Sequence, residues 1–233
     1  MRLNKFISNS GICSRREADK FISMGLVKVN GKVITKMGYK IEPKDNVTFD
    51  EIKINAENLV YVLINKPKGY ILSKKNQYKK NITQLINIEN SSKLISLHSS
   101  NRKSTGVLFL SNDQAFVDNL KNSKNPIKKI LEITLDKKLI KSDLEKIKKK
   151  IFSKSHFKRN KEIINFVSGE LKNKVGVETF YKDINEIFNF FEFFGYKIIS
   201  SDVSVWGPLT KKKLERGQWR FLSKDEISIL KML

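Results

Sequence analysis

Residues 94–113, LISLHSSNRKSTGVLFLSND, decide how the rest of the chain is interpreted. The run 106–110 places the β-formers Val107 and Phe109 among further apolar residues, and this pattern predicts a buried strand. A polar loop, residues 98–105, leads into that strand and contains no apolar side chain. Loops held by a rigid strand often carry the groups that contact a ligand. The sequence therefore places a candidate site where this loop meets the strand.

The charge of the chain favours an anionic partner. Its 233 residues include 46 lysines and arginines against 24 aspartates and glutamates, a formal net charge of +22. An excess of this size makes nucleic acid the first ligand to consider, with a merely soluble basic protein as the alternative. Charge alone does not identify the ligand.

Cysteine usage and hydropathy limit the compartment and the cofactors. Cys13 is the only cysteine and the chain has two histidines, so neither an internal disulfide nor a cysteine–histidine zinc site is expected. The N-terminal residues lack the apolar core of a signal peptide, and no apolar run approaches the length of a membrane span. We expect a cytoplasmic, bacterial, monomeric protein without a membrane partner; an organelle is the alternative location.

Residues 1–50 are predicted to form a small α/β domain. The spacing of Leu3 and Ile7 indicates a short helix, and Ser14 with Glu17 three residues later is the capping-box pattern that begins a second helix. A strand, an Asn-Gly turn and further short strands follow.

The start of the second helix suits a phosphate ligand. Arg15 and Arg16 add guanidinium groups to the free backbone N–H groups of the helix end, a combination that suits RNA phosphates. For two arginines alone, a solvated basic helix is the alternative.

The whole pattern of this first domain is more specific than its arginines. The segments that carry it are Arg2-Leu3-Asn4-Lys5-Phe6-Ile7, Ser14-Arg15-Arg16-Glu17-Ala18 and Gly25-Leu26-Val27-Lys28-Val29-Asn30-Gly31, with Val47. Together they resemble the RNA-binding domain named after small-subunit ribosomal protein four. The resemblance implies an RNA partner.

Residues 51–58 are polar and predict a linker, which leaves residues 59–233 as a second domain. The apolar run 59–64 predicts a buried strand that leads into Asn65-Lys66-Pro67-Lys68-Gly69. Proline and glycine favour a turn there, with Lys66 and Lys68 projecting at its tip.

Several segments of the second domain share a further resemblance. They are Asn65-Lys66-Pro67-Lys68-Gly69, then Thr105-Gly106 with Asn112-Asp113, and the closing segments Val205-Trp206-Gly207-Pro208-Leu209 and 214–222. They resemble the ribosomal RNA pseudouridine synthases that carry an N-terminal RNA-binding domain. The resemblance implies a mixed, mainly antiparallel sheet with flanking helices, a ribosomal RNA substrate and no cofactor.

In the register of that family the catalytic positions are changed. Asn101 takes the place of the catalytic Asp, Ser99 that of a preceding Arg, and Leu131 that of a Tyr that packs near the target base, whereas Lys129 is retained. A neutral amide is a poor nucleophile or base. The resemblance therefore implies no intact catalytic residue, and the sequence shows no metal-ligand cluster and no Gly-rich phosphate loop.

Two further segments leave alternatives open. Residues 136–166 are the most basic part, and the spacing of Leu144 and Ile147 predicts an amphipathic helix whose basic face is either solvated or in contact with phosphates. The family's Arg-rich helix is replaced by an aromatic run from Phe188 to Phe194. Core packing explains most of these rings, and one side remains a candidate patch for a ribosomal protein or for base stacking.

The sequence thus predicts an α+β chain with a small α/β RNA-binding domain and a pseudouridine-synthase-like domain. We favour an inactive homologue that binds ribosomal RNA or the ribosome as an assembly factor or bound factor; an active pseudouridine synthase with a rearranged site is the alternative. The residues predicted to contact RNA are Arg2, Asn4, Lys5, Ser14, Arg15, Arg16, Lys20, Lys28, Asn30, Lys32, Lys66, Lys68, Arg102, Lys103 and Lys129.

Overall fold

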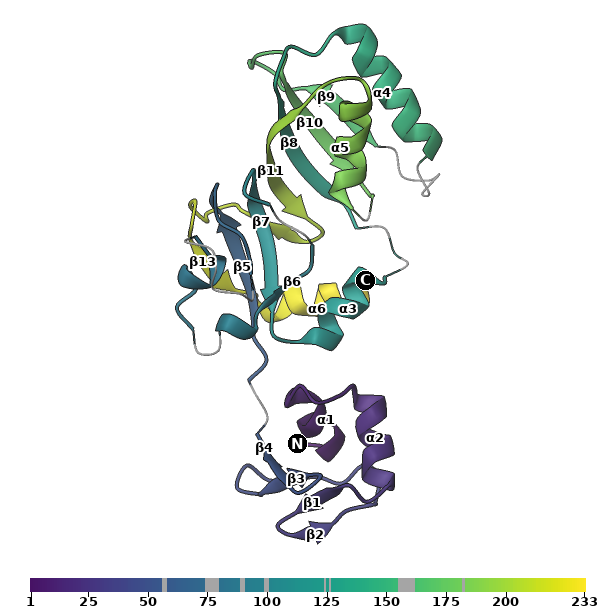
Figure 1. Cartoon of the computed structure of the whole chain (residues 1–233), viewed down its shortest axis with the longest axis vertical. Coiled ribbons are helices and arrows are strands. Elements are labelled where there is room, and N and C mark those ends of the chain that lie inside the picture. The colour runs from purple at the N-terminus through teal and green to yellow at the C-terminus, as the bar shows by residue number, and fades with distance from the viewer. Residues whose placement is uncertain are drawn as a thin grey trace. The chain divides into compact units, whose positions relative to one another are not determined.

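A computed structural model describes residues 1–55, 58–73, 80–88, 91–98, 101–123, 125, 127–154, 162–181 and 183–233. The chain divides into two compact units. The first comprises Met1–Val60 with Asp113–Ala115, and the second comprises Tyr61–Asn112 with Phe116–Leu233. The predicted fold class, α+β, is confirmed (Figure 1).

The first unit packs two helices against an antiparallel sheet. Helices α1 (Leu3–Asn9) and α2 (Arg15–Ser23) accompany four strands in the order β2-β1-β3-β4, which are β1 (Val27–Val29), β2 (Lys32–Val33), β3 (Val47–Phe49) and β4 (Ile52–Ile54). The predicted capping box of α2 is present, with Ser14 and Glu17 exchanging side-chain-to-backbone hydrogen bonds. The predicted hairpin is present as well, because Asn30 and Gly31 both have positive φ angles, as a type I′ turn requires.

The linker prediction for residues 51–58 differs from the structure in its first half. Strand β4 lies in this stretch, where Ile52, Lys53 and Ile54 pair with β3. Ile54 is buried in the same core as Leu3, so its apolar side chain and the ladder bonds draw the segment into the first unit.

The second unit is built on a nine-stranded sheet in the order β13-β5-β7-β11-β8-β10-β9, with β12 paired to β11 and β6 to β7. The β7–β11 pair is parallel and the others are antiparallel. The strands are β5 (Tyr61–Lys66), β6 (Ile95–Ser96), β7 (Ser104–Ser111), β8 (Lys129–Leu135), β9 (Ile163–Phe166), β10 (Lys174–Thr179), β11 (Ile198–Trp206), β12 (Leu209–Thr210) and β13 (Trp219–Phe221).

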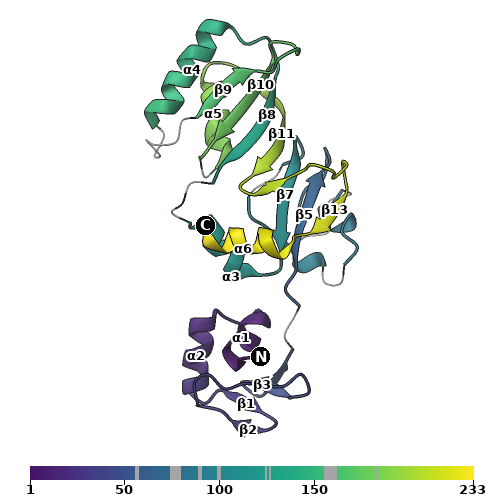
Figure 2. The ribbon, with the colours of Figure 1, turned by 180° about the vertical axis from the view of Figure 1, so that it is seen from behind.

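Helices cover this sheet in two places. Figures 1 and 2 show α4 (Lys141–Lys154) and α5 (Ile184–Phe193) side by side over the part of the sheet formed by β8 to β11. The same views show α3 (Gln114–Lys121) beside α6 (Lys224–Met232). Two short 3₁₀ turns, Ile82–Gln84 and Ser91–Lys93, lie between β5 and β6. No helix among the described residues is both long and apolar enough to cross a membrane.

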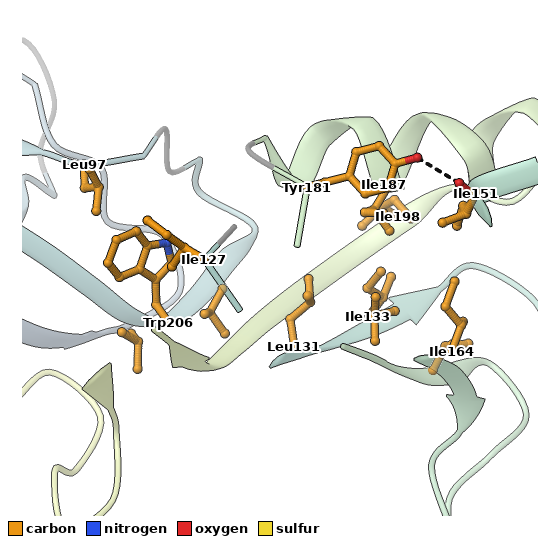
Figure 3. Packing of buried hydrophobic residues seen from close by; sticks show 14 of the residues in the cluster. Leu97, Ile127, Leu131, Ile133, Ile151, Ile164, Tyr181, Ile187, Ile198 and Trp206 are labelled. Carbon is orange, nitrogen blue, oxygen red and sulfur yellow. Dashed lines mark hydrogen bonds between the residues drawn. The ribbon is translucent and has the colours of Figure 1, made fainter. Parts of the chain in front are cut away.

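One continuous core holds the second unit together. Figure 3 shows Leu131, Ile133 and Ile164 of the sheet opposite the side chains of Tyr181 and Ile187. The predicted amphipathic helix is α4, whose buried residues are Leu144, Ile147 and Ile151. The Tyr181 hydroxyl donates a hydrogen bond of 2.9 Å to the carbonyl oxygen of Ile151, so the one polar atom of this ring is satisfied inside the core.

The aromatic run of α5 is mostly core, as expected. Phe190 and Phe191 are buried, Phe188 and Phe194 are half-buried, and Phe193 is 69% exposed. Core packing therefore explains four of the five rings, and one ring faces solvent.

Candidate functional site

A pocket of about 220 Å³ lies where the loop at residues 101–104 meets the parallel strands β7 and β11 and the first turn of α5. All of its walls belong to the second unit. It is smaller than the roughly 300–1,000 Å³ typical of sites for drug-sized ligands, so it suits one small planar group better than an extended molecule. The pocket thus lies where the sequence analysis places a candidate site.

Asn101 lies on the pocket wall, but its side chain stabilises the loop through local hydrogen bonds. Its Oδ1 accepts hydrogen bonds of 2.8 Å from the backbone N–H groups of both Lys103 and Ser104. The Ser104 hydroxyl in turn donates to the Asn101 carbonyl oxygen at 2.9 Å. This arrangement is a local Asx turn, which an Asn forms readily.

Lys66 does not project from a turn, and that prediction was wrong. Strand β5 continues through Lys66, whose side chain is 1% exposed. Its ammonium group donates hydrogen bonds to the carbonyl oxygens of Asn101 at 2.8 Å and Ser104 at 2.5 Å. Burial, together with the positive charge of Arg216, lowers the pKa of Lys66 to about 8. The lysine therefore fastens the loop to the sheet, whereas Lys68 is exposed as expected.

Asp183 is a pocket residue to which sequence reasoning assigned no role. It precedes α5 as its N-cap, and its Oδ1 accepts a 3.0 Å hydrogen bond from the backbone N–H of Asn185. It is the only carboxylate among the described residues that line the pocket. The N-cap pattern of an Asp before an apolar helical run was the signal that could have placed it at the start of the helix.

The remaining helix wall of the pocket consists of the polar Asn185 and two apolar side chains. Ile184 and Phe188 of α5 face the pocket together with Val107 and Val203 of the two parallel strands. No arginine is among the described residues that line it. A planar apolar group would find a ring to contact in Phe188, and a phosphate would find no guanidinium on this wall.

Lys129 and Leu131 do not take the places predicted for them. Strand β8 alternates in burial, and both side chains point to its core face. The ammonium group of Lys129 donates to the carbonyl oxygens of Tyr181 and Ile127, and burial lowers its pKa to about 8 against the opposing charges of nearby carboxylates. A lysine 3% exposed is not available to RNA, so its assignment as an RNA contact is corrected. Leu131 is core and does not line the pocket.

His98 lies between this pocket and a second cavity of about 100 Å³, because it lines both. Its ring stacks on Trp206, with the centroids 6.5 Å apart and the planes 17° from parallel. The atom Nδ1 is buried and has no hydrogen-bond partner among the described residues. Burial, and secondly the charge of Lys129, lowers the pKa of His98 to about 4, although Asp183 acts in the opposite direction.

The low pKa of His98 predicts acid sensitivity. Below pH 6.5 the unfolded chain binds a proton that the folded chain does not, so this contribution to stability is complete above pH 6.5 and is lost towards pH 4. Since the residue is only partly buried, we expect this group to reduce the unfolding free energy of the wild type by about 1–2 kcal/mol between pH 7 and pH 5. The variant His98→Gln lacks this group, so its unfolding free energy should fall by that much less over the same pH range. Urea unfolding at the two pH values measures this difference, and equal losses in both proteins would contradict it.

The residues predicted to contact RNA from the first unit are accessible. Arg2, Lys5, Arg15, Arg16 and Lys20 are exposed, as are Ser14, Asn30 and Lys32. Internal bonds engage a few others: Asn4 donates to Asp19 at 3.0 Å, and Lys28 pairs with Glu51. In the second unit Asn101, Arg102 and Lys103 are exposed, while Ser99 lies outside the described residues. RNA contact by these residues stays a prediction.

Two family models match this chain, and each match lies mainly in one of its two units. Residues 1–47 match the S4 domain, and residues 60–205 match the family described as RNA pseudouridylate synthase. The chain belongs to the RNA pseudouridylate synthase family. The resemblance drawn from the two sets of motifs is thereby confirmed.

Two of its relatives match nearly the whole chain, and a third matches about half of it. An uncharacterized RNA pseudouridine synthase of Aquifex aeolicus is 29% identical over 99% of this chain and 93% of its own length. The dual-specificity RNA pseudouridine synthase RluF of Escherichia coli is 29% identical over 97% and 77%. Ribosomal large subunit pseudouridine synthase B of Bacillus subtilis is 32% identical over 55% of this chain and 52% of its own length. A crystal structure of a pseudouridylate synthase shares the fold, with a TM-score of 0.61, 22% identity and 99% coverage of both chains.

Proposed function

We propose that this protein binds ribosomal RNA and receives one extruded base in the pocket without isomerising it. The observation that carries the proposal is Asn101, which stands on the pocket wall at the position where the family resemblance implies a catalytic Asp. The family's reaction breaks the glycosidic bond of a flipped uridine and rejoins the base through carbon, and it requires an anionic oxygen. Asn101 is neutral, and its Oδ1 already accepts two backbone hydrogen bonds.

The surroundings of Asn101 support the same proposal. Asp ionisation beside a base is helped by a nearby arginine, yet Phe188 occupies the helix wall and Lys66 gives its hydrogen bonds to carbonyl oxygens. A pocket with these walls can still hold a base through its ring and its polar loop. Binding is thus retained in the proposal while the chemical step is not.

Ribosomal RNA is the ligand that the relatives favour. The Bacillus subtilis relative is named for the large ribosomal subunit, and the first unit of this chain matches the S4 domain. The net charge of +22 suits a polyanion, whose binding would be strongly salt-dependent. We therefore propose large-subunit RNA as the first ligand to test, with a role as an assembly factor or bound factor in the cytoplasm.

One observation favours an active enzyme as the second candidate. The Asp183 carboxylate lines the same pocket and could supply the anionic oxygen from the start of α5. This candidate requires Asp183 to leave its capping bond with the Asn185 backbone, or to use Oδ2, which accepts a 3.3 Å hydrogen bond from the Asn185 side chain.

Pseudouridine mapping of ribosomal RNA from wild-type and gene-deletion cells separates the two candidates. We expect identical maps. We also expect Asn101→Asp to remain inactive on large-subunit RNA, because no arginine is among the described residues that line the pocket. A site that disappears on deletion and returns with purified protein would overturn the inactive proposal. If that activity is lost in Asp183→Asn but kept in the control Asp225→Asn on α6, Asp183 would be the carboxylate responsible.

A further inference from the structure

The C-terminal end of α5 carries an aromatic ring that the core does not use. Phe193 is 69% exposed, although Phe190 and Phe191 of the same helix are buried. Phe194 contacts it edge-on, with centroids 5.3 Å apart and planes at 77°. A single exposed apolar residue is ordinary on a protein surface, so the ring matters only together with its neighbours.

Two lysines from the preceding segment lie at this end of α5. The Lys150 ammonium of α4 is 3.0 Å from the centroid of the Phe193 ring, and the Lys137 ammonium is 4.9 Å from that of Tyr196. We call Lys137, Lys150, Phe193 and Phe194 the α5 terminal patch. Because a cation over a ring face is held there by the ring quadrupole, the Lys150 ammonium covers one face of the Phe193 ring. The ring is still 69% exposed, which leaves its other face for a ligand.

The charge around the α5 terminal patch is positive. Residues 137–154 contain eight lysines against two carboxylates, a difference of six. Both carboxylates are already paired, since Asp143 accepts from Tyr196 and contacts Lys146, while Glu145 pairs with Lys148. On α5 the exposed Glu192 opposes this charge locally without cancelling it. The positive charge of this region therefore favours an anionic partner over a protein surface that is apolar or has few acidic residues.

We propose that the α5 terminal patch is a second RNA-binding surface, on which an unpaired base stacks against the face of Phe193 that Lys150 does not cover, while Lys150 and Lys137 contact the adjoining phosphates. Stacking on an aromatic ring combined with ammonium groups is the chemistry by which proteins bind single-stranded nucleic acid without reading its sequence. A base-paired duplex offers no free base face to the ring, so the patch prefers single strands. The patch goes beyond the pocket, but it rests on the RNA-binding part of the proposed function.

The patch lies apart from the pocket on α5. The helix begins with the pocket residue Ile184 and ends at Phe193, a rise of about 14 Å over about two and a half turns. Phe193 therefore lies on the side of the helix opposite Ile184. The α5 terminal patch is thus a surface separate from the pocket.

Binding of a short oligoadenylate to the full chain tests the patch. We expect Phe193→Ala to weaken this binding about tenfold, Phe193→Trp to retain it, and the fluorescence of the new Trp to be quenched when the oligonucleotide binds. Phe152→Ala is the matched control, because Phe152 is an exposed Phe of α4 only two residues from Lys150 and hence on another side of that helix. Binding of an RNA duplex should change little in any of these variants.

The salt dependence supplies an independent readout. Lys150→Gln should reduce the slope of log affinity against log salt by about 0.7, the value for one phosphate contact with a single strand. Equal affinities for Phe193→Ala and Phe152→Ala, or no quenching in Phe193→Trp, would overturn the patch. If the wild type binds neither oligoadenylate nor large-subunit RNA, the proposed function itself fails, and that result is distinct from a failure of the patch alone.

Discussion

Replacing Gly106 by Ala is expected to lower the free energy of unfolding of the second unit by about 4 kcal/mol or more, enough to unfold a marginal domain. Gly106 lies in β7 opposite Val203 of the parallel strand β11. A Cβ atom at this position would lie 2.0 Å from the Val203 carbonyl oxygen and 2.7 Å from its nitrogen. Both obstacles are backbone atoms, so no side-chain rotation relieves the clash.

Backbone conformation and steric clash can be separated with a second glycine. Gly106 has a φ of +96°, and Gly217 has a closely similar φ of +90° but open space, with no atom within 4 Å, where a Cβ atom would lie. Gly217→Ala should therefore cost only the conformational strain, about 1–2 kcal/mol. Urea unfolding followed by circular dichroism measures both variants. Similar losses in the two would contradict a close approach of the strands at Gly106.

The close approach at Gly106 matters because it holds the pocket together. Beside it, Thr105 and Arg216 both donate hydrogen bonds to Asp202, at 2.8 and 3.0 Å. Burial opposes ionisation of Asp202, but the hydrogen bonds from Arg216, Lys211 and Thr105 outweigh it and lower its pKa. Since Arg216 also donates to Asn65, one guanidinium connects β5 and β11.

Local patterns predicted the elements well because each is determined by neighbouring residues. The capping box at Ser14, the Asn30-Gly31 turn and the strand before Asn112 all depend on side chains a few positions apart. Lys66 was misplaced because its burial depends on carbonyl oxygens of Asn101 and Ser104, far along the chain. A buried lysine satisfied by distant backbone groups leaves no local signal.

The candidate site was predicted only in part for the same reason. Asn101 was found by motif, because the motif fixes its position on the loop before β7. Asp183 belongs to the pocket only because α5 packs over the sheet with its first turn at the β7–β11 junction. The burial of Lys129 follows the alternating burial of β8, and which face of β8 is buried depends on its pairing with β11. Tertiary packing, rather than local propensity, supplied what the sequence lacked.

Reversing two charges in the first unit, with the double variant Arg15→Glu and Arg16→Glu, is expected to lower the affinity for large-subunit RNA about a hundredfold. Both arginines are exposed in the first turn of α2. Each change removes a phosphate contact and adds a repulsive carboxylate, and a total of about 2.7 kcal/mol corresponds to a factor of one hundred. Filter binding with transcribed RNA at fixed salt measures the loss.

The same variant should remain folded, which makes its result interpretable. Negative side chains in the first turn interact favourably with the helix dipole, and the Ser14–Glu17 capping box stays in place. The matched control is Lys40→Glu with Lys44→Glu, which makes the same change of charge at two exposed lysines of the first unit that the family resemblance does not include. If the arginines act only through long-range attraction, its loss should weaken binding equally in both double variants. Because direct phosphate contact depends on position, a much larger loss for the α2 variant is the result that assigns the RNA contact to this helix start, and equal losses would contradict it.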